Sequence, residues 1–181
     1  MKNSIKERRQ GFTLIELMVV IAIIGILSAI ILANFSAAKS KSRDGQRISD
    51  VAQIQLALAG YFNQCNDYPN PDTSAGNGTS YIDSSTLSQN VGCPSGVTLA
   101  TFISKIPTPP AGAGQTNYSY AIGYYSTDSS KTPVDYALEA TLENNSSVST
   151  ESLSSFPSTS GITYPASFTC NSNLNYCLGP K

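Results

Sequence analysis

The sequence contains no histidine and no tryptophan, and only 13% of its 181 residues are charged. Histidine is the most common general base and the most common metal ligand in proteins. The sequence also lacks a Cys-x-x-Cys metal spacing, a glycine-rich phosphate loop and a recognisable pairing of a nucleophile with a base. We therefore expect a protein that is not an enzyme and that holds no cofactor.

Basic residues are scarce beyond the first quarter of the chain. From Ile48 onward there are three basic residues against nine acidic ones, a net charge of −6, and most polar residues are Ser, Thr and Asn. An acidic surface repels phosphate, so we expect no direct binding of nucleic acid.

The longest feature is an apolar run, FTLIELMVVIAIIGILSAIILANF, at residues 12–35, in which Glu16 is the only charged residue. About 20 such residues suffice to cross a bilayer as a helix. A cleaved signal peptide, with a site at residues 36–38, is the alternative, but the run is long for the apolar region of a signal peptide. Positive charges are about equal on both sides of the run. We place the C-terminal head outside the cell because its four cysteines fit an oxidising compartment.

A helix is predicted to continue beyond the apolar run to about Asn63. Proline is absent from residues 37–63, and apolar residues recur there at steps of three and four, which indicates one core-facing stripe. The stripe consists of Ile48, Val51, Ile54, Leu58, Tyr61 and Phe62. The basic residues Lys39, Lys41, Arg43 and Arg47 are interpreted as a solvated helix face that could meet acidic residues of a neighbouring subunit.

The rest of the chain indicates a small β-rich domain. Residues 70–98 are predicted to be a long loop and Leu99–Ile106 a short helix. Alternating apolar residues at 118–124 and 134–142 predict a β-hairpin, and Ile162–Thr169 a third strand. The fold class is therefore α+β, with a long N-terminal helix packed on a small antiparallel sheet.

The N-terminal region resembles a type IV prepilin. The resemblance rests on Gly11, on the sequence FTLIE at Phe12–Glu16 and on the apolar run that follows. It implies the pilin fold, cleavage by a prepilin peptidase between Gly11 and Phe12, and N-methylation of Phe12. It also implies storage in the cytoplasmic membrane, contact with an inner-membrane assembly platform, and polymerisation with other pilins into an extracellular filament. One departure is Ala33, where many members have the proline associated with local melting of the helix.

The physical chemistry of Glu16 agrees with this resemblance. A carboxylate in a membrane helix costs about 2.5–3.5 kcal/mol on insertion scales. The free α-amino group of a processed Phe12, on the same or a neighbouring subunit, would offset that cost and set the axial register of assembly. The alternative is that Glu16 reaches the headgroup boundary.

Four cysteines allow three disulfide pairings. We favour Cys65–Cys93, which ties the end of the long helix to the following loop, and Cys170–Cys177, which resembles the disulfide-bounded C-terminal region of many pilins. A weaker hypothesis concerns calcium, because some type II secretion pseudopilins bind it in a head loop. Asp72, Asn77 and Asp83 are the candidate ligands here.

The segments expected are a leader (1–11), a transmembrane and filament-core helix (12–35), an amphipathic helix (36–63) and a disulfide-stapled head (64–181). The expected function is that of a structural subunit of a type IV pilus. A type II secretion pseudopilin or a minor pilin is the alternative, and a membrane-anchored or secreted adhesive module that never polymerises is a second one.

Overall fold

The computed structural model describes residues 11–71, 81–87, 92–127, 133–144, 161–165, 168, 170 and 174–180. Helix α1 spans Leu14–Cys65, α2 spans Ser84–Leu87 and the 3-10 helix η1 spans Leu99–Thr101. The strands are β1 (Tyr81–Ile82), β2 (Tyr118–Tyr125), β3 (Asp135–Thr141), β4 (Ile162–Thr163) and β5 (Asn175–Leu178). The chain divides into two compact units between Lys39 and Ser40. We refer to residues 40–181 as the head unit.

Helix α1 is 52 residues long and passes through position 33 without interruption. It ends where Asn66 adopts a positive φ of 53°, a left-handed conformation that commonly follows the last helical residue. The backbone N–H of Asn66 donates to the carbonyl of Phe62 at 2.8 Å. Pro69 and Pro71 follow, and neither residue can continue a helix. The helix therefore ends within two residues of the predicted Asn63.

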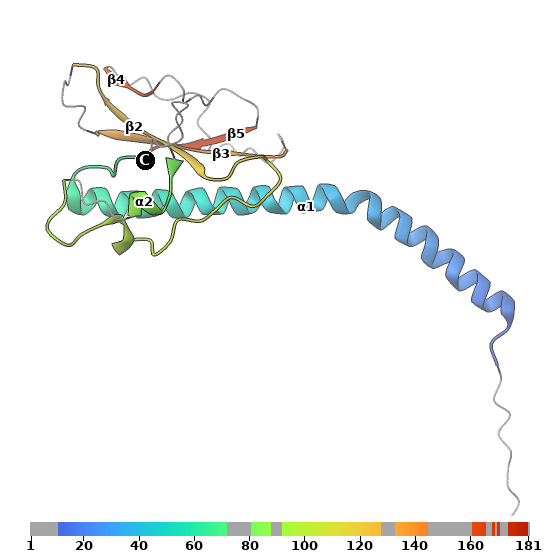
Figure 1. Ribbon diagram of the computed structural model, residues 1–181. Coiled ribbons are helices and arrows are strands. Elements are labelled where there is room, and N and C mark those ends of the chain that lie inside the picture. Colours follow the sequence, from blue (N-terminus) through green and yellow to red (C-terminus); the bar gives the residue numbers. More distant parts are fainter. Residues whose placement is uncertain are drawn as a thin grey trace, which may run out of the picture. The chain divides into compact units, whose positions relative to one another are not determined.

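The head unit contains an antiparallel sheet in the order β1-β2-β3-β5, with β4 paired to β2. The hairpin of β2 and β3 places Tyr120 opposite Leu138 and Ile122 opposite Tyr136. Because side chains alternate between the faces of a strand, Tyr118 and Tyr120 share one face with Tyr136 and Leu138. Figure 1 shows the head part of α1 lying along the sheet.

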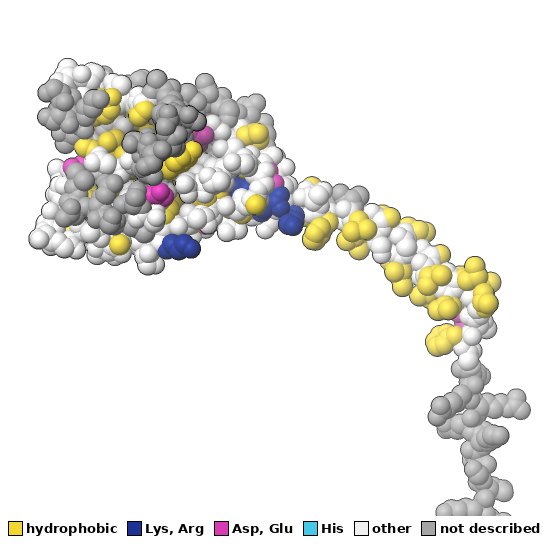
Figure 2. Space-filling view, in the orientation of Figure 1, with side chains coloured by type: hydrophobic (Ala, Val, Ile, Leu, Met, Phe, Trp, Pro, Cys, Tyr) yellow, Lys and Arg dark blue, Asp and Glu magenta, His cyan; other side chains and the backbone are white. Residues whose placement is uncertain are grey.

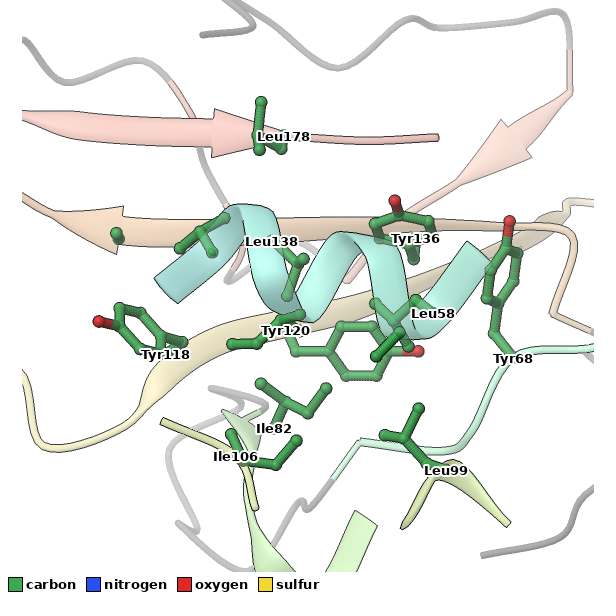
Figure 3. Packing of buried hydrophobic residues seen from close by; sticks show 14 of the residues in the cluster. Leu58, Tyr68, Ile82, Leu99, Ile106, Tyr118, Tyr120, Tyr136, Leu138 and Leu178 are labelled. Carbon is green, nitrogen blue, oxygen red and sulfur yellow. The ribbon is translucent and has the colours of Figure 1, made fainter. Parts of the chain in front are cut away.

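The core fills the space between this part of α1 and the sheet. Val51, Ile54, Leu58 and Tyr61 of α1 are fully buried, as the helical stripe predicted. Figure 3 shows Tyr120 and Leu138 of the sheet beside Leu58, and Ile82 and Leu99 belong to the same cluster. A second cluster on the opposite face of the sheet contains Ala121, Ala137 and the Cys170–Cys177 disulfide.

Several predicted elements differ in extent from the structure. The expected loop at 70–98 contains β1 and α2, and the expected helix at Leu99–Ile106 is only the three-residue η1. The predicted third strand is limited to β4, although part of 162–169 lies outside the described residues. Strand β5 was missed. Strands β1 and β4 pair with β2, and β5 pairs with β3. Long-range pairing therefore stabilises these short strands, and it leaves little local pattern in the sequence.

Candidate functional site

The start of α1 is the site that the sequence analysis singled out. Thr13 precedes the first helical residue, and its hydroxyl accepts a hydrogen bond from the backbone N–H of Glu16 at 3.3 Å. In return, Glu16 Oε2 accepts hydrogen bonds from the Thr13 backbone N–H at 2.8 Å and the Thr13 hydroxyl at 2.7 Å. This reciprocal arrangement is a capping box, which satisfies N–H groups that have no partner within the helix.

The capping box adds a role for Glu16 that the sequence analysis missed. In the unprocessed chain the carboxylate binds Thr13, so part of its cost in an apolar setting is offset within the same helix turn. The signal was present in the sequence as Thr-x-x-Glu immediately before an apolar run. Thr13 therefore joins Glu16 as a residue of the candidate site.

Gly11 and Phe12 lie just before the helix and are exposed, with Phe12 at 92%. A Cβ placed on Gly11 would meet nothing within 4 Å, and its backbone does not have the positive φ that favours glycine. Among the residues that the structure describes, no contact and no backbone conformation requires a glycine at position 11.

The large apolar side chains of Leu14–Leu32 are 51–76% exposed. Figure 2 shows hydrophobic side chains in yellow along this part of the helix. Within the described residues, α1 is the one helix long and apolar enough to cross a membrane by length and composition. A surface of this extent is characteristic of lipid or protein contact.

A buried ion network joins α1 to the residues after β3. Arg47 and Asp44 are both fully buried, and Arg47 Nη1 lies 2.8 Å from Asp44 Oδ1 and 2.8 Å from Glu143 Oε1. Asp44 also accepts hydrogen bonds from the backbone N–H groups of Glu143 and Asn144 at 2.8 and 3.0 Å. Arg47 Nη2 donates to the carbonyl of Pro110 at 2.7 Å.

Arg43 forms a two-pronged ion pair with Glu143, with Nε donating to Oε1 at 2.7 Å and Nη2 donating to Oε2. Hydrogen bonds from Arg43, together with Arg47, lower the pKa of Glu143 to about 2. The interpretation of Arg43 and Arg47 as a solvated face was therefore wrong for these two residues. The carboxylates that they need are supplied by their own head unit, whereas Lys39 and Lys41 are exposed.

The acidic residues of the head unit are less exposed than the sequence suggested. Asp50, Asp67 and Asp135 are at most 8% exposed, and Asp50 accepts a hydrogen bond from the Tyr118 hydroxyl at 2.6 Å. Glu139 is half-buried on β3, and burial raises its pKa to about 7. The expectation of an acidic surface was therefore incorrect for these residues, because folding buries or neutralises them.

The two disulfides are Cys65–Cys93 and Cys170–Cys177, the pairs that the sequence analysis favoured. The first attaches the last residue of α1 to the segment before η1. The second connects β5 to the segment before it.

Two of the three calcium candidates, Asp72 and Asn77, lie outside the described residues. Asp83 is half-buried between β1 and α2, and its backbone N–H donates to the hydroxyl of Thr86 at 3.3 Å. Among the residues that the structure describes, no group of three or more His, Cys, Asp or Glu side chains is arranged to hold a metal ion.

The class of the N-terminal region is identified by a family model. Residues 6–32 match the prokaryotic N-terminal methylation motif. The chain therefore has a prepilin-type N-terminus. Its long helix, antiparallel sheet and two disulfides are consistent with the fold of pilins.

Particular relatives include both pilins and secretion proteins. The chain is 41% identical over 64 residues to type II secretion system core protein G of Aeromonas hydrophila, which covers 35% of this chain and 45% of the relative. It is 39% identical over 61 residues to type IV major pilin protein PilA of Myxococcus xanthus, covering 34% and 28%. It is 34% identical over 96 residues to a fimbrial protein of Neisseria meningitidis, covering 53% and 56%.

The chain thus spans less than half the length of the first two of these relatives. No solved structure matches the chain significantly. The similarity supports the resemblance seen at residues 11–16 and leaves the role of the head to be argued from its own residues.

Proposed function

We propose that this chain is a structural, non-catalytic subunit of a type IV pilus. A prepilin peptidase cuts between Gly11 and Phe12 and methylates the new N-terminus. The subunit is then held in the cytoplasmic membrane by the apolar part of α1, with the head outside. An inner-membrane assembly platform transfers it into an extracellular filament with other pilins.

The observation that carries the proposal is the position of one carboxylate at the start of the exposed apolar part of α1. Glu16 is capped by Thr13 in the first helical turn, next to the proposed cleavage site. Cleavage there would place the positive α-amino group of Phe12 beside Thr13, within the same region as the carboxylate. An ion pair between the Glu16 carboxylate and an N-terminal amine would be a specific contact within a surface that is otherwise apolar.

A type II secretion pseudopilin is the second candidate, and the similarity to core protein G favours it. The Cys170–Cys177 disulfide, which resembles the C-terminal disulfide of many pilins, supports the pilus subunit instead. Abundance separates the two, because a major pilin dominates the protein sheared from the cell surface.

The test is intact-mass analysis of sheared filaments. We expect one dominant subunit of 170 residues that begins at N-methyl-Phe12. A chain that begins at Met1 or Lys39 would contradict prepilin processing. A processed chain that is absent from surface filaments but required for protein secretion would identify the pseudopilin.

Three substitutions separate the pairing of Glu16 from its capping. Glu16→Ala removes both, and we expect normal cleavage with at least tenfold fewer filaments. Thr13→Val removes the hydroxyl hydrogen bonds but keeps the carboxylate, and Thr13→Ser keeps both. We expect Thr13→Val to retain most assembly and Thr13→Ser to behave as wild type. Filaments at the wild-type level from Glu16→Ala would remove the proposed role of the carboxylate.

A further inference from the structure

A polar pocket of about 230 Å³ lies on the face of the sheet that is turned away from α1. Tyr118 and Tyr120 belong to the core under α1, so Ser119 between them is on the other face and lines the pocket. The polar lining residues are Tyr81, Gln115, Thr116, Ser119 and Thr141. None of the described residues that line the pocket is charged. We refer to this space as the sheet pocket, and its hydroxyl and amide groups can both donate and accept hydrogen bonds.

Glu139 lies directly beside the sheet pocket. Ser119 is opposite Tyr81 on one side and opposite Glu139 on the other, so these three residues form a row across β1, β2 and β3. Thr141 follows Glu139 by two residues on β3 and therefore shares its face. Among the described residues, the Glu139 carboxyl group has no hydrogen bond or ion pair, and burial raises its pKa to about 7. It is thus available to accept hydrogen bonds from a ligand and, when protonated, to donate one.

The wall of the sheet pocket is held in place before any ligand arrives. The side-chain oxygen of Gln115 accepts a hydrogen bond from the backbone N–H of Thr141 at 2.9 Å. Its amide nitrogen donates to the Ser119 hydroxyl and to the Glu139 carbonyl, both at 3.4 Å. A few residues earlier, the Pro110 carbonyl accepts a hydrogen bond from buried Arg47. A ligand would therefore lose little affinity to ordering of this segment.

We propose that the sheet pocket, together with Glu139, binds one neutral sugar residue. A sugar carries many hydroxyl groups, and these match a lining of hydroxyls, one amide and one carboxyl group. An anion would meet Glu139 without a cation among the described lining residues, and an apolar ligand would leave the hydroxyl and amide groups without partners. Tyr81 adds an aromatic ring that can cover the apolar side of a sugar.

The same residues favour binding over cleavage. Glycoside hydrolysis normally uses two carboxyl groups that flank the scissile bond. Among the described residues, Glu139 is the one carboxyl group in the row that borders the sheet pocket. The proposal does not depend on assembly into a filament, because every residue that it uses belongs to one head unit.

The experiment titrates the full chain, labelled with ¹⁵N, with sugars while its backbone amide resonances are recorded. The chain is kept in dodecylphosphocholine micelles, because the headgroup of this detergent is not a sugar. D-glucose, D-galactose, D-mannose and N-acetyl-D-glucosamine are the probes, and sodium acetate is the anionic comparison. We expect at least one sugar to give saturable shifts that are concentrated at residues 113–119 and 139–141, and acetate to give none there.

Two variants and a matched control test the residues. Ser119→Ala removes one hydroxyl, and Glu139→Met removes the carboxyl group at similar side-chain length. Each should weaken the binding of that sugar by about fivefold or more, because ligand hydroxyls lose a partner. Ser126→Ala removes an exposed hydroxyl just beyond β2 and outside the sheet pocket, and its affinity should stay within about twofold of wild type. Thermal unfolding checks that each variant is folded before it is titrated.

Three outcomes would overturn the sugar site. The first is that none of the four sugars gives a saturable shift with the wild-type chain. The second is that the shifts are centred on residues outside the sheet pocket, or that acetate produces the same shifts. The third is that folded Ser119→Ala and Glu139→Met bind the sugar as tightly as Ser126→Ala does. Each of these results is independent of whether the chain forms filaments, so it leaves the proposed function standing.

Discussion

Arg47 illustrates how a single buried charge depends on its neighbours. Its guanidinium contacts two carboxylates and a carbonyl, while its Nε has no hydrogen-bond partner among the described residues. Burying a charge is costly unless ion pairs and hydrogen bonds compensate it. The network therefore constrains this part of the head more strongly than an exposed salt bridge would.

We predict that Arg47→Met destabilises the head by about 3–5 kcal/mol, because it leaves Asp44 and Glu143 without their shared cation. The matched control is Lys41→Met, which removes an exposed charge from the same helix and should change stability by less than about 0.5 kcal/mol. Urea unfolding of the full chain in detergent measures both. Equal effects would mean that the ion network contributes nothing specific.

At the scale of elements, the two disulfides close loops of different length. Cys65 and Cys93 are 28 residues apart and connect α1 to a segment outside it, whereas Cys170 and Cys177 are 7 residues apart. A cross-link stabilises mainly by restricting the unfolded chain, and a longer loop is restricted more. The first disulfide should therefore matter more to the stability of the head.

Replacement of Cys65 and Cys93 together by Ser is predicted to cost about 2–4 kcal/mol of unfolding free energy. The loop-entropy relation places this cost about 1 kcal/mol above that of replacing Cys170 and Cys177 together. Denaturant unfolding of the two double variants under identical conditions provides the comparison. A larger loss from the Cys170–Cys177 pair would indicate that its packing in the second core cluster outweighs loop entropy.

At the scale of the whole molecule, folding removes charge from the surface of the head. Asp44, Arg47 and Asp50 are buried, and Arg43 neutralises Glu143. Figure 2 accordingly shows few charged side chains on the described part of the head. Low surface charge weakens repulsion between copies, which favours close association.

The same burial predicts how stability depends on pH. Glu139 has a pKa raised by burial from 4.5 to about 7, so the folded state binds its proton more tightly than the unfolded state does. Its contribution is therefore present below about pH 4.5 and is lost as the pH rises through 7. Glu143 has a pKa lowered to about 2, so its contribution is present above about pH 4.5 and is lost as the pH falls toward 2.

We expect Glu139→Gln to reduce the loss of stability between pH 5 and pH 8 by roughly 1–3 kcal/mol, because the amide cannot ionise. Thermal or urea unfolding at the two pH values measures the change. Glu143→Gln is the comparison. It should reduce the loss of stability at acid pH and leave the dependence of stability on pH above pH 5 almost unaltered. A Glu139→Gln profile parallel to that of wild type would contradict the assignment.

Local pattern was sufficient to predict several features of this protein. In three segments the pattern of apolar residues extends over many positions, so that it specifies the element and its buried face. These segments are the apolar run, the helical stripe from Ile48 to Phe62, and the hairpin of β2 and β3. The motif at Gly11–Glu16 is likewise contiguous, and even the overlooked capping box was readable as Thr-x-x-Glu.

Only the tertiary structure decided which charges remain free and which short segments form strands. Glu143 is 100 residues from Arg43, and no local pattern connects the two. Strand β5 exists because it pairs with β3, and Leu56 differs from Leu58 only in which side of the helix the sheet covers. Sequence by itself determines features whose cause lies within one helix or hairpin, whereas burial and pairing depend on contacts that only the folded chain creates.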